Sequence, residues 1–186
     1  MSFRALTHDL RRVRKHRHAS AIEMILTAKH IAAWRAFLNS GGDYLIVTES
    51  DAVFADDSRQ RLKQCLMAIR AHGPDKLLYI DLAGGFTREE LRIDNIVSFE
   101  RNGFTYFEPA ATNSSGAYLL SRATVCSFCA TLQQFPYFHW ISSDWMVNAI
   151  MMDHMKRAKT ILCMHANPPI LKHGSVSGEY NAWKRS

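Results

Sequence analysis

Short apolar runs of strand length alternate with longer segments of helical periodicity along this chain, and this alternation most constrains its fold. The runs at 44–48 and 76–82 are mainly apolar, which is typical of strands buried on both faces of a sheet. Each run is flanked by segments long enough to form helices. The alternation therefore predicts an α/β domain in which helices cover a mixed central sheet.

The remaining segments complete this pattern. The stretch 95–109 predicts a hairpin inserted in the domain, with Asn102-Gly103 as its turn, because this dipeptide favours the turns of hairpins. Serine and aspartate are favoured at helix N-caps. On this basis we predict helices over 20–38, from Asp57 or Ser58, after Ser121, and from Ser142 or Ser143. A last strand is predicted over 160–165, followed by an irregular tail.

The length and composition are those of one globular domain. The chain has 186 residues, of which 47% are hydrophobic and 22% charged, and this balance supports a hydrophobic core. No apolar run approaches the roughly 20 residues of a membrane-spanning helix. We assign one domain to 20–178, between a basic arm at 1–19 and a tail at 179–186. The arm lacks the apolar segment of a secretory signal, so we expect a cytoplasmic location.

The net charge of +6 is concentrated in the basic arm, where Arg, Lys and His fill most of positions 11–18. Such a cluster attracts polyanions, which here could be nucleic acid, anionic lipid head groups at the inner membrane or a diphosphate substrate. It could equally be a solvated arm. Elsewhere the basic residues are scattered and do not alternate with aromatic residues, which argues against nucleic acid as the main partner.

The four cysteines do not suggest a disulfide scaffold in a chain of this length. Cys126 and Cys129 have the spacing of a zinc knuckle, but neither a second Cys pair nor a His-x-x-x-His partner follows them. They also lie within an apolar helical stretch. We therefore interpret both as core thiols, because a free cysteine behaves as a small buried hydrophobe.

Within the helix predicted over 20–38, Lys29 falls near the middle of an apolar stripe. The residues of this stripe are Ile22, Ile25, Leu26, Ala33 and Phe37. A buried lysine is costly unless its amine reaches water or meets an anion. The stripe therefore predicts either a lysine that extends to solvent or one that contacts an anionic ligand. His30 and Trp34 lie one turn apart at its edge.

Two acids follow the first strand directly, since Glu49 and Asp51 come immediately after 44–48. In open α/β sheets, ligands bind at the carboxyl ends of the strands. Magnesium and manganese favour one or two carboxylates together with substrate phosphates. The acids therefore predict a metal–diphosphate site, and the alternative is a strand that ends in solvent with polar residues.

Three stretches together resemble glycosyltransferase family 25, the enzymes of bacterial lipooligosaccharide assembly and their collagen-galactosyltransferase relatives. The stretches are "ILTAKHIAAWRAFLNSGGDYLIVTESDAVF", "TNSSGAYLLSRATV" and "SSDWMV". The positions that match the family pattern are His30, Trp34, Glu49, Asp51, the run from Gly116 to Arg122, Asp144, Trp145, Pro168 and Pro169. The resemblance covers 20–178. Ser50 departs from it by replacing the middle acid, Lys29 stands where the family usually has serine, and the usual first strand is absent.

The resemblance implies a GT-A-like (Rossmann-like) three-layer fold. It also implies transfer of a hexose from a nucleotide sugar, commonly a UDP-hexose, to a cell-envelope glycan or glycolipid, with inversion at the anomeric carbon. On this basis Glu49 and Asp51 are candidate ligands of Mn²⁺ or Mg²⁺, with His173 as a late ligand or a solvent-facing histidine. The candidates for donor binding are Lys29, His30, Ser121 and Arg122.

Asp144 is the candidate general base that an inverting displacement requires near the acceptor hydroxyl. Trp145 beside it offers a ring that could stack on a sugar. Asp144 could instead be the N-cap of its helix, His30 a hydrogen-bonded half-buried histidine, and Tyr118 a core residue. A second hypothesis is a catalytically inactive relative that binds a glycan or a protein, motivated by Ser50 and the absent first strand.

Overall fold

Six strands form a mixed central sheet in the computed structural model, which describes residues 19–84, 96–112 and 114–174. The strands are β1 (Tyr44–Thr48), β3 (Leu78–Asp81), β4 (Val97–Arg101), β5 (Phe104–Glu108), β6 (Ala117–Ser121) and β7 (Leu162–Ala166). They lie in the order β1-β6-β3-β7-β5-β4. Strands β3 and β7 pair in parallel, and the other neighbours are antiparallel. The predicted α/β class and mixed sheet are confirmed.

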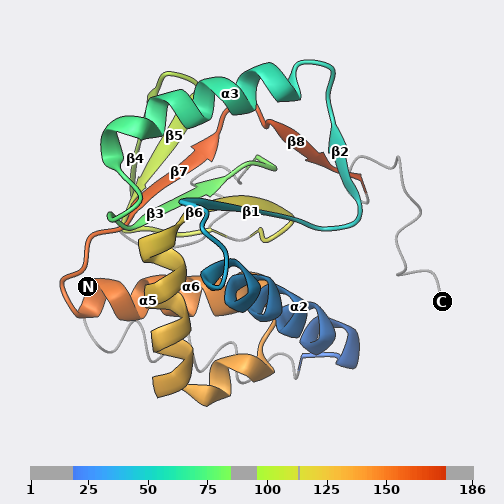
Figure 1. Ribbon diagram of the computed structural model, residues 1–186, viewed down its shortest axis with the longest axis vertical. Coiled ribbons are helices and arrows are strands. Elements are labelled where there is room, and N and C mark those ends of the chain that lie inside the picture. Colours follow the sequence, from blue (N-terminus) through green and yellow to red (C-terminus); the bar gives the residue numbers. More distant parts are fainter. Residues whose placement is uncertain (1–18, 85–95, 113, 175–186) are drawn as a thin grey trace.

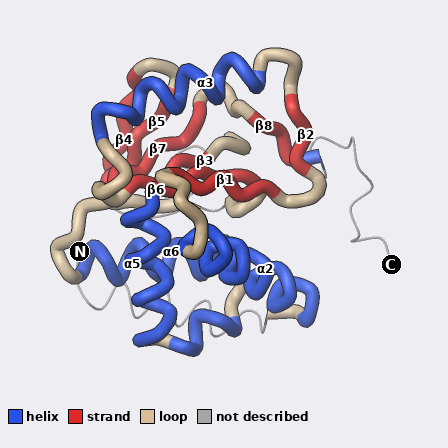
Figure 2. Tube along the Cα trace, in the orientation of Figure 1, coloured by secondary structure: helices blue, strands red, loops and turns tan. Residues whose placement is uncertain are grey.

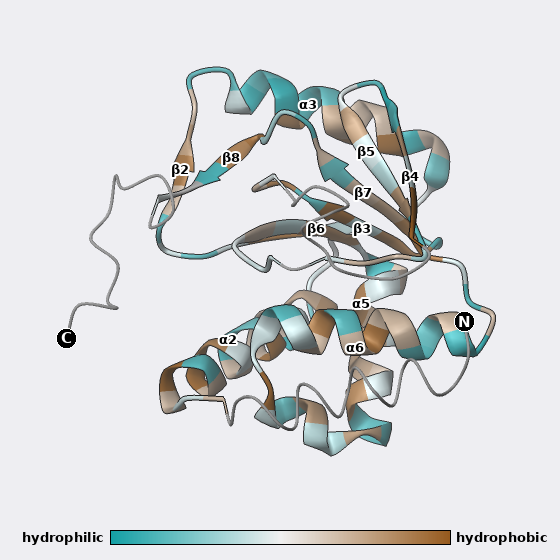
Figure 3. Ribbon diagram, turned by 180° about the vertical axis from the view of Figure 1, so that it is seen from behind, coloured by the Kyte–Doolittle hydropathy of each residue, from teal (hydrophilic) through white to brown (hydrophobic). Residues whose placement is uncertain are grey.

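Helices cover both faces of this sheet, which gives three layers (Figures 1 and 2). The helices are α2 (Ala21–Leu38), α3 (Ser58–Ile69), α5 (Arg122–Gln134) and α6 (Ser143–Lys156), with the short 3₁₀ helices η1 (Arg70–His72) and η2 (Pro136–Trp140). Helix α3 lies on one face, and α2, α5 and α6 lie on the other. Each face has its own apolar core. The central strands are mainly apolar, as Figure 3 shows, because both of their faces are covered.

The strand directions gather several polar segments at one edge of the sheet. Strand β1 is antiparallel to β6, β6 is antiparallel to β3, and β3 is parallel to β7. The carboxyl ends of β1, β3 and β7 therefore meet the amino end of β6. Glu49 after β1, Asp81 at the end of β3, and residues 114–116 before β6 consequently share this edge.

A second, two-stranded sheet was not predicted from the sequence. Strand β2 (Ala52–Phe54) pairs in antiparallel register with β8 (Leu171–His173), in the part of the chain predicted as an irregular tail. Both strands are only three residues long, too short for an alternating pattern to be recognised. This ribbon lies to one side of the main sheet (Figure 1). It places the chain around residue 173 beside the acids after β1.

Helix α2 presents a different face to the core than the one predicted. The apolar residues Ile22 and Ile25 are 50% and 57% exposed, and Lys29 is also exposed. The buried residues are Thr27, His30, Ile31, Trp34 and Phe37. The helix carries apolar residues on all of its sides, so their spacing in the sequence did not define one buried face. The prediction that Lys29 lies within the buried stripe is wrong.

Local turn and cap predictions are confirmed at two places. Asn102 and Gly103 form the turn between β4 and β5, and both have positive φ, at 53° and 76°, as such tight hairpin turns require. Ser121 is the N-cap of α5, where its side chain accepts a hydrogen bond from the Thr124 N–H. Ser142 occupies the N-cap of α6 without a side-chain hydrogen bond.

The two cysteines Cys126 and Cys129 differ in their surroundings. The side chain of Cys126 is exposed, so its interpretation as a core thiol is wrong. Cys129 is half-buried and packs against the apolar core that contains Val125 and Phe128. Periodicity identified the helix but did not separate its two faces.

Within the described ranges, no helix is long and apolar enough to cross a membrane. The predicted basic arm at 1–19 lies outside these ranges except for its last residue, and the tail at 179–186 lies outside them entirely.

Candidate active site

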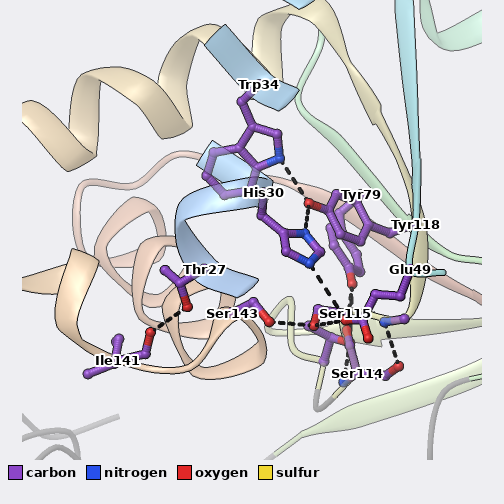
Figure 4. Close-up of polar contacts among 12 residues, drawn as sticks. Thr27, His30, Trp34, Glu49, Tyr79, Ser114, Ser115, Tyr118, Ile141 and Ser143 are labelled. Carbon is purple, nitrogen blue, oxygen red and sulfur yellow. Dashed lines mark hydrogen bonds and ion pairs between the residues drawn. The ribbon is translucent and has the colours of Figure 1, made fainter. Parts of the chain in front are cut away.

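Glu49 joins four parts of the fold at the polar edge of the sheet (Figure 4). Its backbone N–H donates to the Gly116 carbonyl at 2.8 Å, and its Oε1 accepts from the Ser115 hydroxyl at 3.1 Å. The same Oε1 lies 3.6 Å from Nε2 of His30 on α2. Ser115 Oγ is 2.7 Å from Oγ of Ser143, the first residue of α6. The carboxylate that follows β1 is therefore held by α2 and by the segment before β6, which links it to α6.

Behind Glu49, a buried relay of hydrogen bonds runs from Trp34 through Tyr118 to His30. Trp34 Nε1 donates to the Tyr118 hydroxyl at 2.9 Å, and this oxygen is 2.8 Å from His30 Nδ1. An indole N–H can only donate, so the Tyr118 proton is available to His30 Nδ1. This assignment puts the ring proton of His30 on Nε2, facing Glu49. All three side chains are buried, so the relay fixes the orientation of the histidine.

Burial supports this direction of hydrogen bonding. It raises the pKa of Tyr118 far above its ordinary value of 10.0, and the Glu49 charge adds to this rise, although the Trp34 hydrogen bond opposes it. The tyrosine hydroxyl therefore keeps its proton at any physiological pH. Tyr118 was predicted to be a core residue, which is confirmed, and its polar tip also orients His30.

Replacing Tyr118 by phenylalanine should lower the free energy of unfolding. The change leaves the Trp34 N–H and His30 Nδ1 buried without their shared partner, and an unsatisfied buried polar group costs about 1–3 kcal/mol. Chemical denaturation measures this loss. Tyr137→Phe is the matched control, because Tyr137 is 56% exposed and should lose little. Equal stability of the two variants would contradict the relay.

Asp51 lies where the β2–β8 ribbon begins. Its backbone carbonyl accepts from the Gly174 N–H at 2.8 Å, and Ala52 is the register partner of His173. The structure thus brings the backbone of His173, predicted as a late metal ligand, next to the acidic pair. Within the described parts of the chain, no group of three or more His, Cys, Asp or Glu side chains is close enough to hold a metal ion.

The donor set nevertheless fits a hard cation that is completed by substrate. Glu49 and Asp51 supply carboxylate oxygens, and magnesium or manganese commonly takes one or two carboxylates plus substrate phosphates and water. A dedicated cage of protein ligands is therefore not required. Glu49 is held by its neighbours and Asp51 is half-buried at the edge.

Asp144 is the second residue of α6, directly after Ser143. The N-cap of this helix is Ser142, so the alternative interpretation of Asp144 as an N-cap is wrong. Asp144 is half-buried, and Trp145 beside it is 50% exposed. Because Ser143 contacts Ser115, the first turn of α6 adjoins the Glu49 network (Figure 4).

The structure does not bring Lys29, Ser121 or Arg122 to Glu49. Lys29 lies on the exposed side of α2. Ser121 pairs with Tyr44 at the opposite end of β1, and its hydroxyl donates to the Lys76 carbonyl at 2.6 Å.

Arg122 binds the end of α2 and the loop after it. Its guanidinium donates to the carbonyls of Gly42 at 2.7 Å and Leu38 at 3.3 Å, and also to that of Ser40. It lies 4.8 Å from the centre of the Phe37 ring. These contacts satisfy carbonyls left open at the helix end, which is a structural role.

Ser115 and Ser143 are site residues that sequence reasoning did not single out. Both are buried, and their contact, between residues 28 positions apart in the sequence, joins Glu49 to α6. The available signal was weak. Ser115 lies in the matched stretch "TNSSGAYLL", and Ser143 precedes Asp144. Hydroxyl contacts between distant segments leave no periodic pattern.

Comparison with known proteins identifies relatives of one kind. The chain is 24% identical over 135 residues to the lacto-N-neotetraose biosynthesis glycosyltransferase LgtE of Neisseria meningitidis serogroup B (strain ATCC BAA-335 / MC58), which covers 72% of this chain and 48% of the relative. It is 23% identical over 113 residues to LgtE of Neisseria gonorrhoeae, which covers 61% of this chain and 40% of that relative. The chain thus spans less than half the length of these curated relatives. No protein-family model matches it.

The aligned segments are long enough to include most of the described fold, and both relatives are glycosyltransferases of lacto-N-neotetraose biosynthesis by name. The resemblance that the motifs around His30, Glu49 and Asp144 indicated is thereby confirmed, and the chain resembles the glycosyltransferases of family 25.

Proposed function

We propose that the chain is a GT-A-like glycosyltransferase domain that transfers a hexose from a nucleotide sugar, a UDP-hexose, to a glycan or glycolipid acceptor of the cell envelope. The observation that carries this proposal is the placement of Glu49 and Asp51 directly after β1, with Glu49 linked through Ser115 and Ser143 to the start of α6. The relatives named for lacto-N-neotetraose biosynthesis support sugar transfer as the chemistry.

In this proposal Asp51 and Glu49 hold Mn²⁺ or Mg²⁺ with the donor diphosphate. The ion, when bound, supplies positive charge that neutralises the leaving diphosphate. Ser115 and His30 hold the Glu49 carboxylate in one orientation, so little reorganisation is needed when the donor binds. His173 is a further candidate ligand because β8 places its backbone opposite Ala52.

The acceptor is deprotonated by Asp144. The acceptor oxygen attacks the anomeric carbon from the side opposite the diphosphate, the bond between that carbon and the diphosphate oxygen breaks, and the acceptor proton passes to Asp144. Attack from the opposite side inverts the anomeric carbon. The half-exposed Trp145 provides an apolar face for a sugar ring beside the base. A peripheral membrane contact through the basic arm stays a prediction.

A thermal-shift panel of UDP-, GDP- and CMP-sugars, each with and without Mn²⁺, tests the donor site. A ligand that binds only the native state at about 100 times its Kd stabilises it by about 2.7 kcal/mol, which corresponds to roughly 5–10 °C for a domain of this size. We expect this shift with one nucleotide only when the metal is also present. It should disappear in Asp51→Ala.

Asp56→Ala is the matched control, because Asp56 is an exposed carboxylate in the loop before α3. It should keep the full shift. A flat panel from folded protein would instead favour a catalytically inactive relative that binds a glycan or a protein. Ser50, in place of the middle acid of the family motif, is the observation on which that second function rests.

A further inference from the structure

A buried carboxyl lies close to the proposed site but takes no part in the chemistry described so far. Asp81, the last residue of β3, is completely buried. Its Oδ1 accepts from the Ala83 N–H at 3.0 Å, and its Oδ2 lies 3.1 Å from the hydroxyl oxygen of Thr112. The burial of this carboxyl requires a physical explanation, because moving a charged group out of water is costly.

The segment that Asp81 contacts is the segment that holds Glu49. Thr112 lies three residues before Ser115, whose hydroxyl donates to Glu49, and four before Gly116, whose carbonyl accepts from the Glu49 N–H. We define residues 111, 112 and 114–116 as the β6-entry segment. Its position determines where the Glu49 carboxylate is held.

The β6-entry segment is fixed by buried side chains from three elements. Asn148 of α6 accepts from the Thr112 N–H at 2.9 Å and donates to the Thr112 carbonyl. Tyr79 of β3 donates to the Ser114 carbonyl at 3.2 Å, and His165 of β7 lies 2.9 Å from the Ala111 carbonyl. A carbonyl only accepts, so His165 Nε2 carries the proton in this contact.

Counting protons shows that the network around Thr112 depends on the proton of Asp81. The Thr112 hydroxyl lies 3.1 Å from both Asp81 Oδ2 and the Ser114 carbonyl, and it accepts from the Ser114 N–H. The Tyr79 hydroxyl lies 3.3 Å from the Thr112 hydroxyl and 3.2 Å from the Ser114 carbonyl, and each hydroxyl has one proton to donate. If Asp81 is ionised, the Thr112 proton goes to Asp81, and the Ser114 carbonyl accepts at most the one hydrogen bond from Tyr79.

If Asp81 is protonated, the direction reverses. Asp81 then donates to Thr112, and Thr112 donates to the Ser114 carbonyl, which thereby gains a second hydrogen bond. The hydroxyl protons of Thr112 and Tyr79, and the carboxyl proton of Asp81 when present, each have an acceptor in both arrangements, so neither is excluded by an orphaned donor. They differ in how firmly the residue before Ser115 is held.

Among Asp81 and its buried neighbours Tyr79, Tyr118, Cys163 and His165 in the described part of the chain, Asp81 is the one whose charge changes near neutral pH. Burial raises the pKa of Asp81 from 3.8 to about 7, with the hydrogen bonds from Thr112 and Ala83 opposing the rise. Burial also raises the pKa of Tyr79 and Tyr118, raises that of Cys163 to about 12, and lowers that of His165 to about 4. Those four neighbours are therefore uncharged.

We propose that Asp81 is a positioning residue that sets the β6-entry segment, and through Ser115 the Glu49 carboxylate, in one of two hydrogen-bond arrangements according to whether it carries a proton. The protonated arrangement holds the Ser114 carbonyl by two hydrogen bonds and the ionised arrangement by at most one. The consequence for sugar transfer rests on the proposed function. The change in the β6-entry segment does not.

The experiment is an NMR titration of the labelled protein through neutral pH, which follows the Asp81 carboxyl, the Thr112 methyl and the amides of Ser114 and Ser115. We expect all four to titrate with one midpoint near pH 7, the pKa of Asp81. Asp81→Asn should abolish the titration of the segment, because the asparagine NH₂ donates to Thr112 as the protonated carboxyl does. Asp153→Asn, at the far end of α6, is the matched control and should leave it unchanged.

Thr112→Val is a second variant, in case the first does not fold. It keeps the side-chain shape and removes the hydroxyl, so Asp81 should still titrate while Ser114 and Ser115 no longer follow it. Segment signals that titrate equally in Asp81→Asn or Thr112→Val, or that stay constant in the unmodified protein, would overturn the proposal.

A parallel rate measurement separates this proposal from the function. If the chain transfers sugar, the pH profile of kcat/KM should carry the same midpoint and lose it in Asp81→Asn. If no variant transfers sugar, the proposed function fails, and the NMR titration still decides the role of Asp81.

Discussion

Asp144→Asn should lower the rate of sugar transfer by about 100- to 10,000-fold, the contribution typical of a positioned general base. Asparagine has nearly the shape of aspartate but cannot take the acceptor proton. Asp144 lies in the first turn of α6, where a negative charge contributes only about 0.3–1 kcal/mol to stability. The loss of activity should therefore not be a loss of folding. Product formation at saturating donor is the measurement.

Two observations make this test specific. Donor-induced thermal stabilisation should persist in Asp144→Asn, because the base contacts the acceptor and not the diphosphate. Asp153→Asn changes the same chemical group on the same helix, where Asp153 pairs with Arg157 at 2.9 Å, and it should transfer sugar at nearly the unmodified rate. An Asp144→Asn variant with most of the original activity would remove Asp144 from the reaction.

Asp81→Asn and His165→Gln should change the pH dependence of stability in opposite directions. The pKa of Asp81 rises from 3.8 to about 7 on folding, so its protonated form stabilises the folded state below pH 3.8, and this contribution is lost as the pH rises through about 7. The pKa of His165 falls from 6.5 to about 4. Its neutral form stabilises the folded state above pH 6.5, and this is lost as the pH falls through about 4.

The contributions of Asp81 and His165 make the free energy of unfolding change with pH in opposite directions, and in the unmodified protein these two slopes oppose each other over nearly the same pH range. Asp81→Asn leaves the histidine, so its stability should rise with pH, whereas His165→Gln leaves the carboxyl, so its stability should fall. A tenfold change in proton affinity corresponds to about 1.4 kcal/mol, so each slope should span on the order of 3 kcal/mol. The amide that His165→Gln introduces can still donate to the Ala111 carbonyl, which limits other effects of the change.

Chemical denaturation at steps between about pH 4 and pH 8 measures these slopes as free energies. His154, whose pKa is also lowered by burial, is present in all three proteins and does not affect the differences. Three parallel curves would show that neither buried group changes its proton affinity on folding.

The central strands were predictable because burial on both faces makes them mainly apolar, as in β3. The apolar run 44–48 also forms a strand, but β1 lies at the edge of the sheet and Ile46 is 38% exposed, so the expectation that this run is buried on both faces is wrong. The Asn102-Gly103 turn has a strong local preference. The faces of α2 and α5 were not predictable in the same way. On α2, Ile22 and Ile25 are exposed while Thr27 and His30 are buried, because hydrogen bonds to Ile141 and Tyr118 decide which side faces inward.

The site was predicted in part for a similar reason. Glu49, Asp51 and the helix start at Asp144 follow directly from strand ends and caps, which are local features. The serines that connect them, and the buried Asp81, depend on contacts between segments far apart in the sequence. Arg122 was expected near the diphosphate because of its positive charge, but it binds carbonyls at the end of α2 and in the loop after it. Its charge alone could not reveal these backbone partners.

The β2–β8 ribbon has a practical consequence for handling the protein. The Gly174 N–H donates to the Asp51 carbonyl, so the last described residue lies next to Asp51. A carboxyl-terminal affinity tag, and a polyhistidine tag above all, would attach a metal-chelating sequence to a segment that begins there. Metal titrations are therefore cleanest with protein purified through a removable amino-terminal tag.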